Sequence, residues 1–475
     1  MFFYIYITPY KNYQRNMSDN IEDFKPEAWV ANATSSTTIS LVDTFEGKLA
    51  SFKPSFTYPI FGETEQVFGY KDLEIILAFD SKNFTPFLNV KFSEKLDDEL
   101  LLEKAKMDAN IDYDDEEEDE EHDGQEDQED QENQEDQEDV EQDFEDEENE
   151  EEQETVEFDP LIKLAKLMPT EDLTIKDEEA WTRKCHDDKD LVKNILHADG
   201  EAIATTDTAL VYKINISKFK NIHDRLKLFS LLFIEGASYI QDDDEVWDVY
   251  VMLEKDTDKI IGYATCYKYW NYNGGSKAFD SLVNVPQDYS YKGRISQFLI
   301  FPTFQNKKFG SLFYNAIYES WLKDNSIIEI NVEDPNESFD ALRDKNDFNR
   351  IIKTSQFMSM IDSSLYSKSN QPKEVLEKNY IQLLDFLQTK MKFQYKQAQR
   401  LLEMVFIYLN LDDFIKLVMM KRVFKQNYEV LLDFSKEDRN EKLAETVENI
   451  KQEYFERISL LIESDEPPSN KKQKI

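Results

Sequence analysis

The chain has 475 residues, and its 55 Lys and Arg against 99 Asp and Glu give a formal net charge of −44. A protein of this charge repels phosphate, which excludes nucleic-acid binding by bulk attraction, and we expect no direct contact with nucleic acid. The 40% of hydrophobic and 13% of aromatic residues suffice for a sizeable core, and the length suggests two or three domains of about 150 residues each.

Cysteine and histidine counts and the apolar runs exclude further classes. Two cysteines and four histidines cannot form a disulfide framework or a zinc finger of familiar spacing, so we expect a reducing compartment and no bound metal. No run of about 18 apolar residues occurs, and we expect no membrane contact. Residues 1–16 are apolar but lack the basic leading region and cleavage site of a signal peptide. We interpret them as an extension outside the fold.

Residues 17–111 and 160–221 are predicted to form an amino-terminal α/β region in two parts. The first part carries strand-like pieces at 51–58 and 73–79, with turn residues between them. The second part has a helical or mixed pattern over 160–191.

An acidic block at 112–159 separates these two parts. It contains 31 Asp and Glu and no Lys or Arg, so the rest of the chain has 68 acids against 55 bases, a net charge of −13. Such a block cannot bury enough apolar surface to offset chain entropy, and we predict a disordered insertion. It is either a solvated spacer or a polyanion that attracts a basic protein.

Residues 222–345 show the clearest pattern. Apolar residues at spacings of three and four predict a helix with one buried face that ends near Ile240. Two aromatic and β-branched runs, 247–253 and 260–269, are separated by a polar turn and predict an antiparallel hairpin.

The remainder of this region predicts a strand, a helix and a second strand. Residues 295–301 form a strand stopped by Pro302, a helix starts near Gly310, and apolar and polar residues alternate from Ile328 to Glu333. The order of helix, hairpin, strand, helix and strand indicates an α+β fold with a mixed sheet flanked by helices.

Residues 346–463 predict a carboxy-terminal helical domain. Leucine-rich segments at helical spacing suggest four or so helices, without strands or a second catalytic group. The tail, 464–475, has three lysines after two prolines, which is either a weak nuclear-import signal or merely a polar end.

The segment from Phe298 to Lys323 carries the candidate chemistry. A strand that leads directly into a helix leaves backbone N–H groups of the first helical turn unpaired, and the helix dipole adds partial positive charge. The loop 305–311, QNKKFGS, lies at this junction. A pyrophosphate would fit there.

Six segments together carry a resemblance to a known family: FKPEAWV, FGYKDLEIILAFD, LFSLLFIEGASYI, YKYW, RISQFLIFP and NVEDPNESFDALRD. With these segments the chain resembles the catalytic subunit of the type B histone acetyltransferases, a branch of the GNAT superfamily. The resemblance runs from about Phe24 to Asp344, with the acidic block as an insertion, and continues weakly into the helices. It implies a GNAT-type mixed sheet and transfer of an acetyl group from acetyl-CoA to lysine.

The resemblance implies that acetyl-CoA lies where the strand through Phe298 diverges from the strand ending at Glu333. Backbone amides of the first strand would hold the pantetheine arm, and the loop would hold the pyrophosphate. The implied cofactor-binding residues are Phe298, Leu299, Ile300, Gln305, Asn306, Lys307, Lys308, Phe309, Gly310, Ser311, Asn336 and Lys345.

Lys308 departs from the family pattern Gln-x-x-Gly-x-Gly, since it stands at the first glycine. If the position needs a positive φ, lysine costs about 1 kcal/mol or more. Its charge could compensate partly beside a phosphate.

Catalysis needs a base, because a lysine amine with an ordinary pKa near 10.4 must lose a proton before it attacks a thioester. The resemblance puts the general base at Glu333, at the end of a predicted strand, with Asp334 and Glu235 as supporting acids. Cys266 lies on a predicted strand, and we interpret it as a small core residue rather than a covalent catalyst.

Substrate binding is predicted from charge and aromatic residues. A basic histone tail needs acids for attraction and aromatic walls for the lysine stem. The residues that resemble the tail-binding surface of the family are Glu63, Glu65, Tyr269, Trp270 and Tyr272.

Three functions compete. The first is transfer of acetyl from acetyl-CoA directly to a lysine in the amino-terminal tail of newly made histone H4. The second is an acidic histone-binding escort in which the Lys308 departure signals weak or lost catalysis; joint retention of Glu333, Asp334, Asn336 and Glu235 favours the first. A small-molecule acetyltransferase is disfavoured by the long additions on both sides of the core. The resemblance implies histone H4 with H3 and a WD-repeat histone-binding subunit as partners, and a cytoplasmic and nuclear location.

Overall fold

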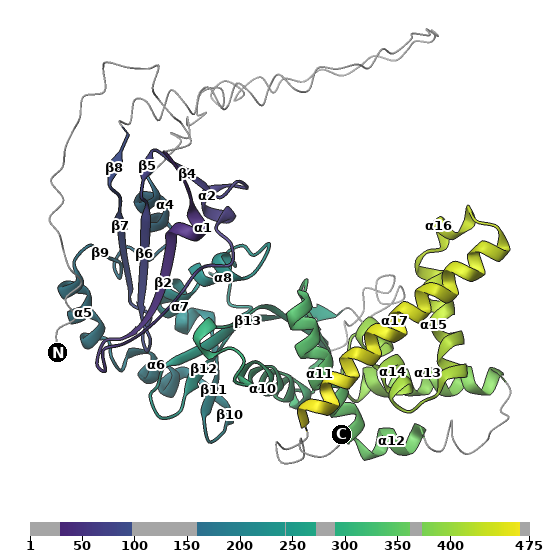
Figure 1. Cartoon of the computed structure of the whole chain (residues 1–475). Helices are drawn as coiled ribbons and strands as arrows, with labels where there is room; N and C mark the ends of the chain where they lie inside the picture. Colours follow the sequence, from purple (N-terminus) through teal and green to yellow (C-terminus); the bar gives the residue numbers. More distant parts are fainter. Residues whose placement is uncertain (1–28, 97–158, 243, 272–289, 362–372, 466–475) are drawn as a thin grey trace, which may run out of the picture. The chain divides into compact units, whose positions relative to one another are not determined.

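The computed structural model describes residues 29–96, 159–242, 244–271, 290–361 and 373–465 (Figure 1). The predictions for residues 1–16, for the acidic block before Asp159 and for Tyr272 therefore lie outside the described residues, as does nearly all of the tail. No helix within the described ranges is both long and apolar enough to cross a membrane.

The chain divides into two compact units, and it passes between them several times. The first unit takes its described residues from 29–38, 57–77, 88–96 and 159–167, and the second takes them from 39–56, 78–87 and the described residues from 168 onward. All the residues of the candidate site that the resemblance assigns to catalysis or cofactor binding belong to the second unit.

Short elements make up the first unit. The helix α1 is capped by Asn32, whose side chain accepts a hydrogen bond from the backbone N–H of Ser35. Lys95 pairs with Asp159 at 3.3 Å, just before α4. Its complete elements are β1 (Val30–Asn32), α1 (Ala33–Ser36), α2 (Tyr58–Phe61), β4 (Gln66–Phe68), β5 (Tyr70–Lys71), β8 (Glu94–Lys95) and α4 (Pro160–Lys166).

A five-stranded sheet has the order β3-β2-β6-β7-β9. The predicted strand at 73–79 is present as β6, whereas the prediction for 51–58 is wrong after Phe52, because Pro59 favours the start of α2. The strands are β2 (Thr37–Asp43), β3 (Lys48–Phe52), β6 (Glu74–Asp80), β7 (Pro86–Lys91) and β9 (Thr174–Ile175).

Arg225, only 4% exposed, ties together several segments of the second unit. Its guanidinium donates to Asp172 at 2.7 Å and to Asp188 at 2.8 Å, and also to Thr85 Oγ1 at 3.0 Å. Burying a guanidinium costs free energy unless its charge is paired, and here the two carboxylates supply that pairing.

The six-stranded sheet that carries the candidate site has the order β10-β11-β12-β13-β14-β15. All neighbours pair antiparallel except β14 and β15, which are parallel, so the predicted mixed sheet is confirmed. The first two strands are absent from the sequence-based prediction. The strands are β10 (Glu201–Thr205), β11 (Ala209–Asn215), β12 (Trp247–Glu254), β13 (Ile260–Asn271), β14 (Ser290–Ile300) and β15 (Ile327–Val332).

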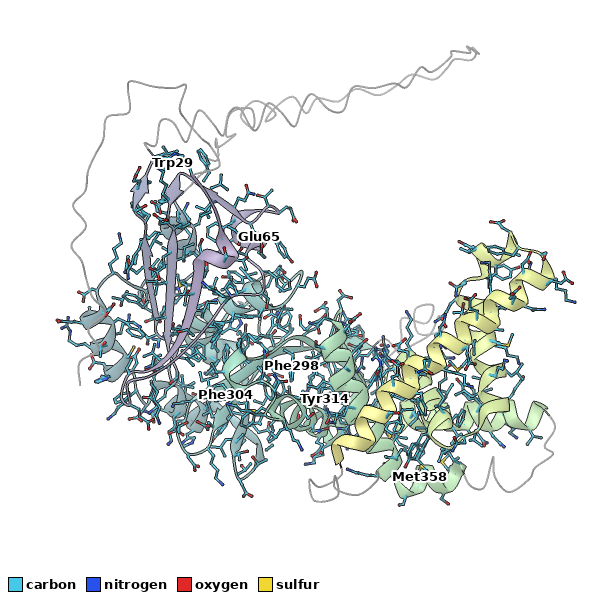
Figure 2. All side chains as sticks on the ribbon, viewed as in Figure 1. Trp29, Glu65, Phe298, Phe304, Tyr314 and Met358 are labelled. Carbon is cyan, nitrogen blue, oxygen red and sulfur yellow. The ribbon has the colours of Figure 1, made fainter. Side chains whose placement is uncertain are left out.

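Helix α10 (Phe309–Lys323) packs on this sheet, as the sequence predicts. The indole N–H of Trp321 donates to the hydroxyl of Tyr250 at 2.8 Å across the buried interface. Gly293 on β14 is required there, since a Cβ atom at this position would lie 2.9 Å from the Trp321 ring. Figure 2 labels Tyr314 of α10, whose ring is buried.

The helices before β12 differ from the prediction. The predicted helix to Ile240 is wrong: α7 (Ile216–Leu226) and α8 (Leu228–Phe233) cover its first part, and the chain then turns at Gly236, whose φ is +69°. Apolar spacing continues past Phe233, but a left-handed glycine ends the helix. Helices α5 (Glu178–Asp187) and α6 (Leu191–Asp199) lie earlier in the chain.

The predicted helical domain is confirmed after β15. Its core is continuous with that of the sheet and α10. Lys392 joins the two, because its amine donates to the carbonyls of Trp321, Leu322 and Asp324 at the end of α10. The helices are α11 (Glu337–Lys353), α12 (Ser355–Ile361), α13 (Lys373–Thr389), α14 (Tyr395–Tyr408), α15 (Asp412–Gln426), α16 (Tyr428–Leu432) and α17 (Lys436–Asp465).

Candidate active site

The parallel strands β14 and β15 are the last two strands of the six-stranded sheet, and they diverge about halfway along β14. Their last paired residues are Ile295 and Val332, and the N–H of Glu333 still donates to the carbonyl of Ile295 at 3.0 Å. Strand β14 then continues to Ile300 while β15 has ended. Residues 297–300 pair only with β13, so their other edge is left open by β15.

The parting coincides with an irregularity in β14. Thr265 of β13 lies opposite Gln297, but the next residue, Cys266, lies opposite Ile295. Ser296 is therefore an extra residue in β14, a β-bulge. Bulges bend a strand, increase its local twist and re-aim side chains, and they are common next to active sites.

Glu333 directly follows β15, and its carboxylate turns toward β14. Ser296 Oγ donates to Glu333 Oε2 at 2.6 Å, and Arg294 Nη1 lies 3.6 Å from Oε1. The Glu333 side chain is 37% exposed. The carboxylate is thus held by two side chains of the neighbouring strand and still faces solvent.

Arg294 is itself held by groups on both neighbouring strands, β13 and β15. Its guanidinium donates to the hydroxyl groups of Tyr267 at 3.0 Å and Tyr269 at 3.4 Å, and its Nε donates to Asn331 Oδ1 at 3.1 Å. Burial acts to lower the pKa of Arg294, but the hydroxyl groups of Tyr269 and Tyr267 outweigh burial and raise that pKa. The positive charge beside Glu333 is therefore permanent.

Side chains of the open segment of β14 are used for packing. Phe298, labelled in Figure 2, packs at a tilt against Phe313 and meets Phe339 edge to face. Leu299 and Ile300 are buried. The open edge of this segment is therefore lined by backbone groups, of which the Ile300 carbonyl already accepts a hydrogen bond from the Gln305 amide.

The loop after β14 leads into α10 through a short 3₁₀ turn, Pro302–Phe304. The Gln305 amide donates to the carbonyl of Ile300 at 2.9 Å, which ties the loop to the strand end, and Lys307 donates to the carbonyl of Thr303 at 2.8 Å. Residues 305–308 are exposed. Helix α10 starts without a side-chain cap, so first-turn N–H groups face the loop.

Lys308 adopts the left-handed conformation, with φ +68° and ψ 3°. The family glycine at this position is thus explained, and lysine carries a backbone cost of about 1 kcal/mol. Asn306 is also left-handed, with φ +59°. Gly310 is needed for a different reason, because a Cβ atom there would lie 2.7 Å from Leu342 of α11.

Two further predicted cofactor-binding residues lie on or beside α11. Asn336 caps this helix, since its Oδ1 accepts from the N–H of Phe339 at 2.9 Å. Lys345 is half-buried about two and a half turns further along the same helix. Ser311 Oγ accepts from Asn346 Nδ2 at 3.1 Å, which fixes the start of α10 against α11.

The supporting acids lie on loops. Asp334 is exposed and has a positive φ of 32°, directly after Glu333. Glu235 is exposed in the turn after α8. The predicted helix to Ile240 would include this residue, and that prediction is wrong. The loop of Glu235 does reach β14, because the buried Gln297 amide donates to the carbonyl of Ser238 at 2.9 Å.

The acidic residues predicted for substrate binding belong to the first unit. Glu63 is exposed, but the carboxylate of Glu65 accepts from the backbone N–H groups of Thr57 at 2.5 Å and Tyr58 at 3.2 Å. The bond from Thr57 lowers the pKa of Glu65. This acid therefore organises its own loop and start of α2.

The aromatic residues predicted for substrate binding lie at the end of β13. Trp270 is 51% exposed, which is unusual for a large indole. Tyr269 is half-buried and belongs to the group around Arg294. Tyr272 lies beyond the described part of β13.

Cys266 is fully buried in the core beneath the sheet. Burial raises the pKa of its thiol well above the ordinary value, so no thiolate forms at neutral pH. It is a core residue, as predicted.

His223, Asp224 and Asp242 form a group with spacing that could hold a metal ion. Lys220 and Lys227 already pair with Asp242, and Lys227 also pairs with Asp224. Burial lowers the pKa of His223 to about 4. We assign no metal to these residues, because their carboxylates already have cationic partners.

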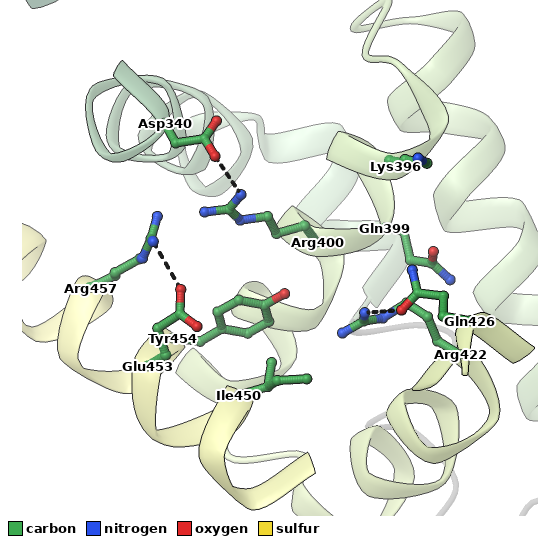
Figure 3. A pocket seen from close by; sticks show the side chains of 10 residues that line it. All are labelled: Asp340, Lys396, Gln399, Arg400, Arg422, Gln426, Ile450, Glu453, Tyr454 and Arg457. Carbon is green, nitrogen blue, oxygen red and sulfur yellow. Dashed lines mark hydrogen bonds and ion pairs between the residues drawn. The ribbon is translucent and has the colours of Figure 1, made fainter. Parts of the chain in front are cut away.

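A cavity of about 380 Å³ lies between helices of the carboxy-terminal domain (Figure 3). Arg400 and Arg457 both form ion pairs with the buried Asp344, and Arg422 donates two hydrogen bonds to the carboxylate of the buried Glu403. The charges lining this cavity are thus largely matched from within, and we assign no ligand to it.

Arg294 and Ser296 are the site residues that sequence reasoning missed. Both lie in RISQFLIFP, directly before the predicted cofactor strand. Two polar residues in an otherwise apolar strand could have indicated a functional site. The bulge at Ser296, however, cannot be recognised from the sequence.

Comparison with known proteins agrees with this geometry. The family model described as "Histone acetyl transferase HAT1 N-terminus" matches residues 29–134 and 131–235. The histone acetyltransferase type B catalytic subunit of Kluyveromyces lactis is 32% identical over 92% of this chain and 94% of its own length. The subunit of the same name from Candida glabrata is 34% identical over 96% and 99%.

This chain belongs to the type B histone acetyltransferase catalytic subunits. It is therefore an acetyltransferase that acts on histones. Among solved structures, the chain is similar to the xEco2 acetyltransferase domain, with a TM-score of 0.21, 13% identity and coverage of 30% of this chain and 87% of that one. A soil metagenomic aminoglycoside acetyltransferase gives a TM-score of 0.22, 15% identity and coverage of 31% and 88%.

Proposed function

We propose that this acetyltransferase moves the acetyl group of acetyl-CoA directly to a lysine in the amino-terminal tail of newly made histone H4, with Glu333 as general base. The observation that carries the proposal is the carboxylate of Glu333 at the point where β14 and β15 diverge. The open backbone edge of β14 and an acid therefore lie next to each other.

The chemical step needs only a proton acceptor and a polarised thioester. The substrate ammonium gives a proton to Glu333, and the amine nitrogen then forms a bond to the acetyl carbonyl carbon. The carbon–sulfur bond breaks and the sulfur leaves as the thiolate of CoA, while the nitrogen loses its second proton, which the thiolate takes up to give the neutral amide and free CoA. No covalent enzyme intermediate is required, which agrees with the burial of Cys266.

Three features of this chain fit acetyl-CoA. Among the described residues, no strand pairs with residues 297–300 on the side of the opening, so their backbone groups there can bond the pantetheine amides, apart from the Ile300 carbonyl that accepts from Gln305. The N–H groups at the start of α10 suit a pyrophosphate. The amine of Lys308, exposed beside these groups, adds positive charge.

The substrate and partner assignments rest on charge and on the family. The net charge of −44 favours basic proteins, and an exposed Trp270 next to the open end of β13 suits a lysine stem. We extend the proposal to histone H4 together with H3, to a WD-repeat histone-binding subunit, and to a cytoplasmic and nuclear location.

Glu333→Gln tests the base. Because the amide cannot accept the proton, we expect kcat with an H4 tail peptide to fall about 10²-fold or more, with acetyl-CoA affinity nearly unchanged. Labelled acetyl-CoA measures the rate, calorimetry measures the affinity, and mass spectrometry locates the acetylated lysine.

Peptides from the tails of the other histones serve as controls for the substrate. Wild-type turnover in Glu333→Gln across the pH range would refute the base assignment. A preference for another tail by kcat/KM would refute H4 as the substrate and leave the acetyltransferase activity in place.

A further inference from the structure

We infer that Arg294 is the positioning residue for Glu333, and that Ser296 and Arg294 together leave Oε1 as the oxygen that takes the proton. This inference rests on the proposed function, since it assumes that Glu333 is the base. It goes further by naming the side chains that prepare the base.

The two carboxylate oxygens of Glu333 have different surroundings. Oε2 accepts the Ser296 hydroxyl at 2.6 Å, a short hydrogen bond that occupies one lone pair and fixes the plane of the carboxylate. Oε1 has Arg294 Nη1 at 3.6 Å, which is within ion-pair range but beyond a hydrogen bond. Oε1 therefore feels the positive charge and keeps its lone pairs open to an incoming amine.

Arg294 can play this part because it is fixed before substrate arrives. The hydroxyls of Tyr267 and Tyr269 come from β13, and Asn331 Oδ1 comes from β15. Asn331 also donates to the hydroxyl of Tyr269 at 2.9 Å, so these groups hold each other as well as the guanidinium. The flexible side chain of Arg294 thus has little freedom left to lose.

The register of the sheet explains why these groups meet. Arg294 lies opposite Tyr267 on one side and opposite Asn331 on the other, so all three share one face. Glu333 stands two residues beyond Asn331 and continues that face. Ser296, at the bulge of β14, brings its hydroxyl to the Glu333 carboxylate from the strand that also carries Arg294.

The permanent charge acts on the carboxylate and not on the substrate amine. The guanidinium lies 3.6 Å from Oε1 and fixes where this oxygen points, while the ammonium of a substrate lysine gives its proton to Oε1. Tyr269, predicted to contact the histone tail, acts in this arrangement through Arg294.

Arg294→Gln removes the positive charge and replaces the guanidinium with a shorter amide. We expect kcat on core histones to fall about tenfold or more, since small displacements of a catalytic group have large effects on rate, while KM for acetyl-CoA changes less than twofold. Arg294→Lys should recover part of the loss, because it keeps the charge. Arg183→Gln, at a side chain that is 68% exposed on α5, is the matched control and should behave as wild type.

The deciding measurement is the double variant with Glu333→Gln. If Arg294 acts through Glu333, adding Arg294→Gln to Glu333→Gln should change kcat less than twofold. The full loss appearing again in that background would overturn the inference, and so would a wild-type kcat in Arg294→Gln alone. Wild-type turnover in Glu333→Gln, in contrast, would refute the base itself.

Two gentler variants cover the case in which Arg294→Gln does not fold. Ser296→Ala and Tyr269→Phe each delete one hydroxyl and keep the shape of the side chain. Each should lower kcat several-fold with unchanged KM for acetyl-CoA, and each loss should vanish in the Glu333→Gln background. Wild-type kcat in both would overturn the inference.

Discussion

Lys308 combines backbone strain with a charge in one residue of the candidate cofactor loop. Its left-handed φ of +68° is easy for glycine and costly for lysine. The exposed amine of Lys308 lies at the start of α10. If it binds the cofactor, its charge offsets the free-energy cost of the left-handed backbone.

Replacing Lys308 by glycine separates the two effects. Lys308→Ala is the matched control for strain, because it removes the same charge and keeps the Cβ atom that the left-handed backbone disfavours. We expect Lys308→Gly to be more stable than Lys308→Ala by about 1 kcal/mol in urea unfolding. Equal stabilities would contradict the strain.

Calorimetry on Lys308→Gly and Lys307→Gly measures the affinity of each variant for acetyl-CoA. A loss of affinity in Lys308→Gly alone that disappears at high salt would identify a charge contact with the pyrophosphate. Equal or better affinity would mean that relief of strain outweighs the charge.

The residues of the candidate site were predictable to different degrees. Glu333 and the loop at Gly310 stand in recognisable motifs, and their places at a strand end and a helix start were read correctly from periodicity. Arg294 and Ser296 were not predictable, since a bulge depends on the pairing of two strands and not on one of them. The role of Glu65 in its own loop likewise depends on a contact with Thr57, eight residues away.

At the scale of elements, the junction of α10 with β15 is held by charge. Asp324 ends α10, and its carboxylate pairs with Lys268 of β13 at 2.7 Å and accepts from Ser326 at 2.6 Å. Burial alone would raise the pKa of Asp324, but the bonds from Lys268 and Ser326 lower it to about 2. Three elements around the candidate site depend on one ionised carboxylate.

Asp324→Asn tests this dependence through pH. A carboxylate whose folded pKa is lowered stabilises the fold above its unfolded pKa of about 3.8, and this stability is lost as pH falls toward 2. We therefore expect the wild type to lose stability more steeply than Asp324→Asn between about pH 5 and pH 2. Parallel urea midpoints for the two proteins over this range would contradict the pairing.

Prediction of elements succeeded where the pattern was local. The hairpin β12–β13, the strand β14 and helix α10 all follow from apolar spacing and turn residues. Prediction failed at α8, where apolar spacing ran on past the helix end, and at β10 and β11, which pair with each other and join the sheet only through β12, on the far side of α7 and α8 in the chain. Strands of this kind gain their stability from neighbours that the sequence does not place beside them.

At the scale of the whole molecule, charge is the property that one segment dominates. Residues 112–159 carry 31 of the 99 acids, and without them the net charge is −13 instead of −44. A field of that size raises the encounter rate with basic proteins and is screened by salt.

Deleting residues 112–158 tests the block while keeping Asp159, the partner of Lys95. We expect slower association with whole histones at low ionic strength, and the difference should fade as the Debye length falls from about 30 Å at 0.01 M to about 8 Å at 0.15 M. Stopped-flow fluorescence measures the association rate. Turnover of a short tail peptide at saturation should not change.

The melting temperature is the control for this deletion. The block is poor in apolar residues, so its loss should leave the melting temperature unchanged. Histone kinetics identical to wild type at every salt concentration would reduce the block to a spacer.

The extra residue in β14 has a consequence for how such a site can arise. Without Ser296, Ile295 and Gln297 would be adjacent and would still face Cys266 and Thr265, so the ladder with β13 would be regular and every other side chain would keep its face. In genetic terms, the difference between the two sheets is one in-frame codon. A single insertion thus delivers both the bend that parts the strands and the hydroxyl that holds the acid, and neither has to wait for a second mutation.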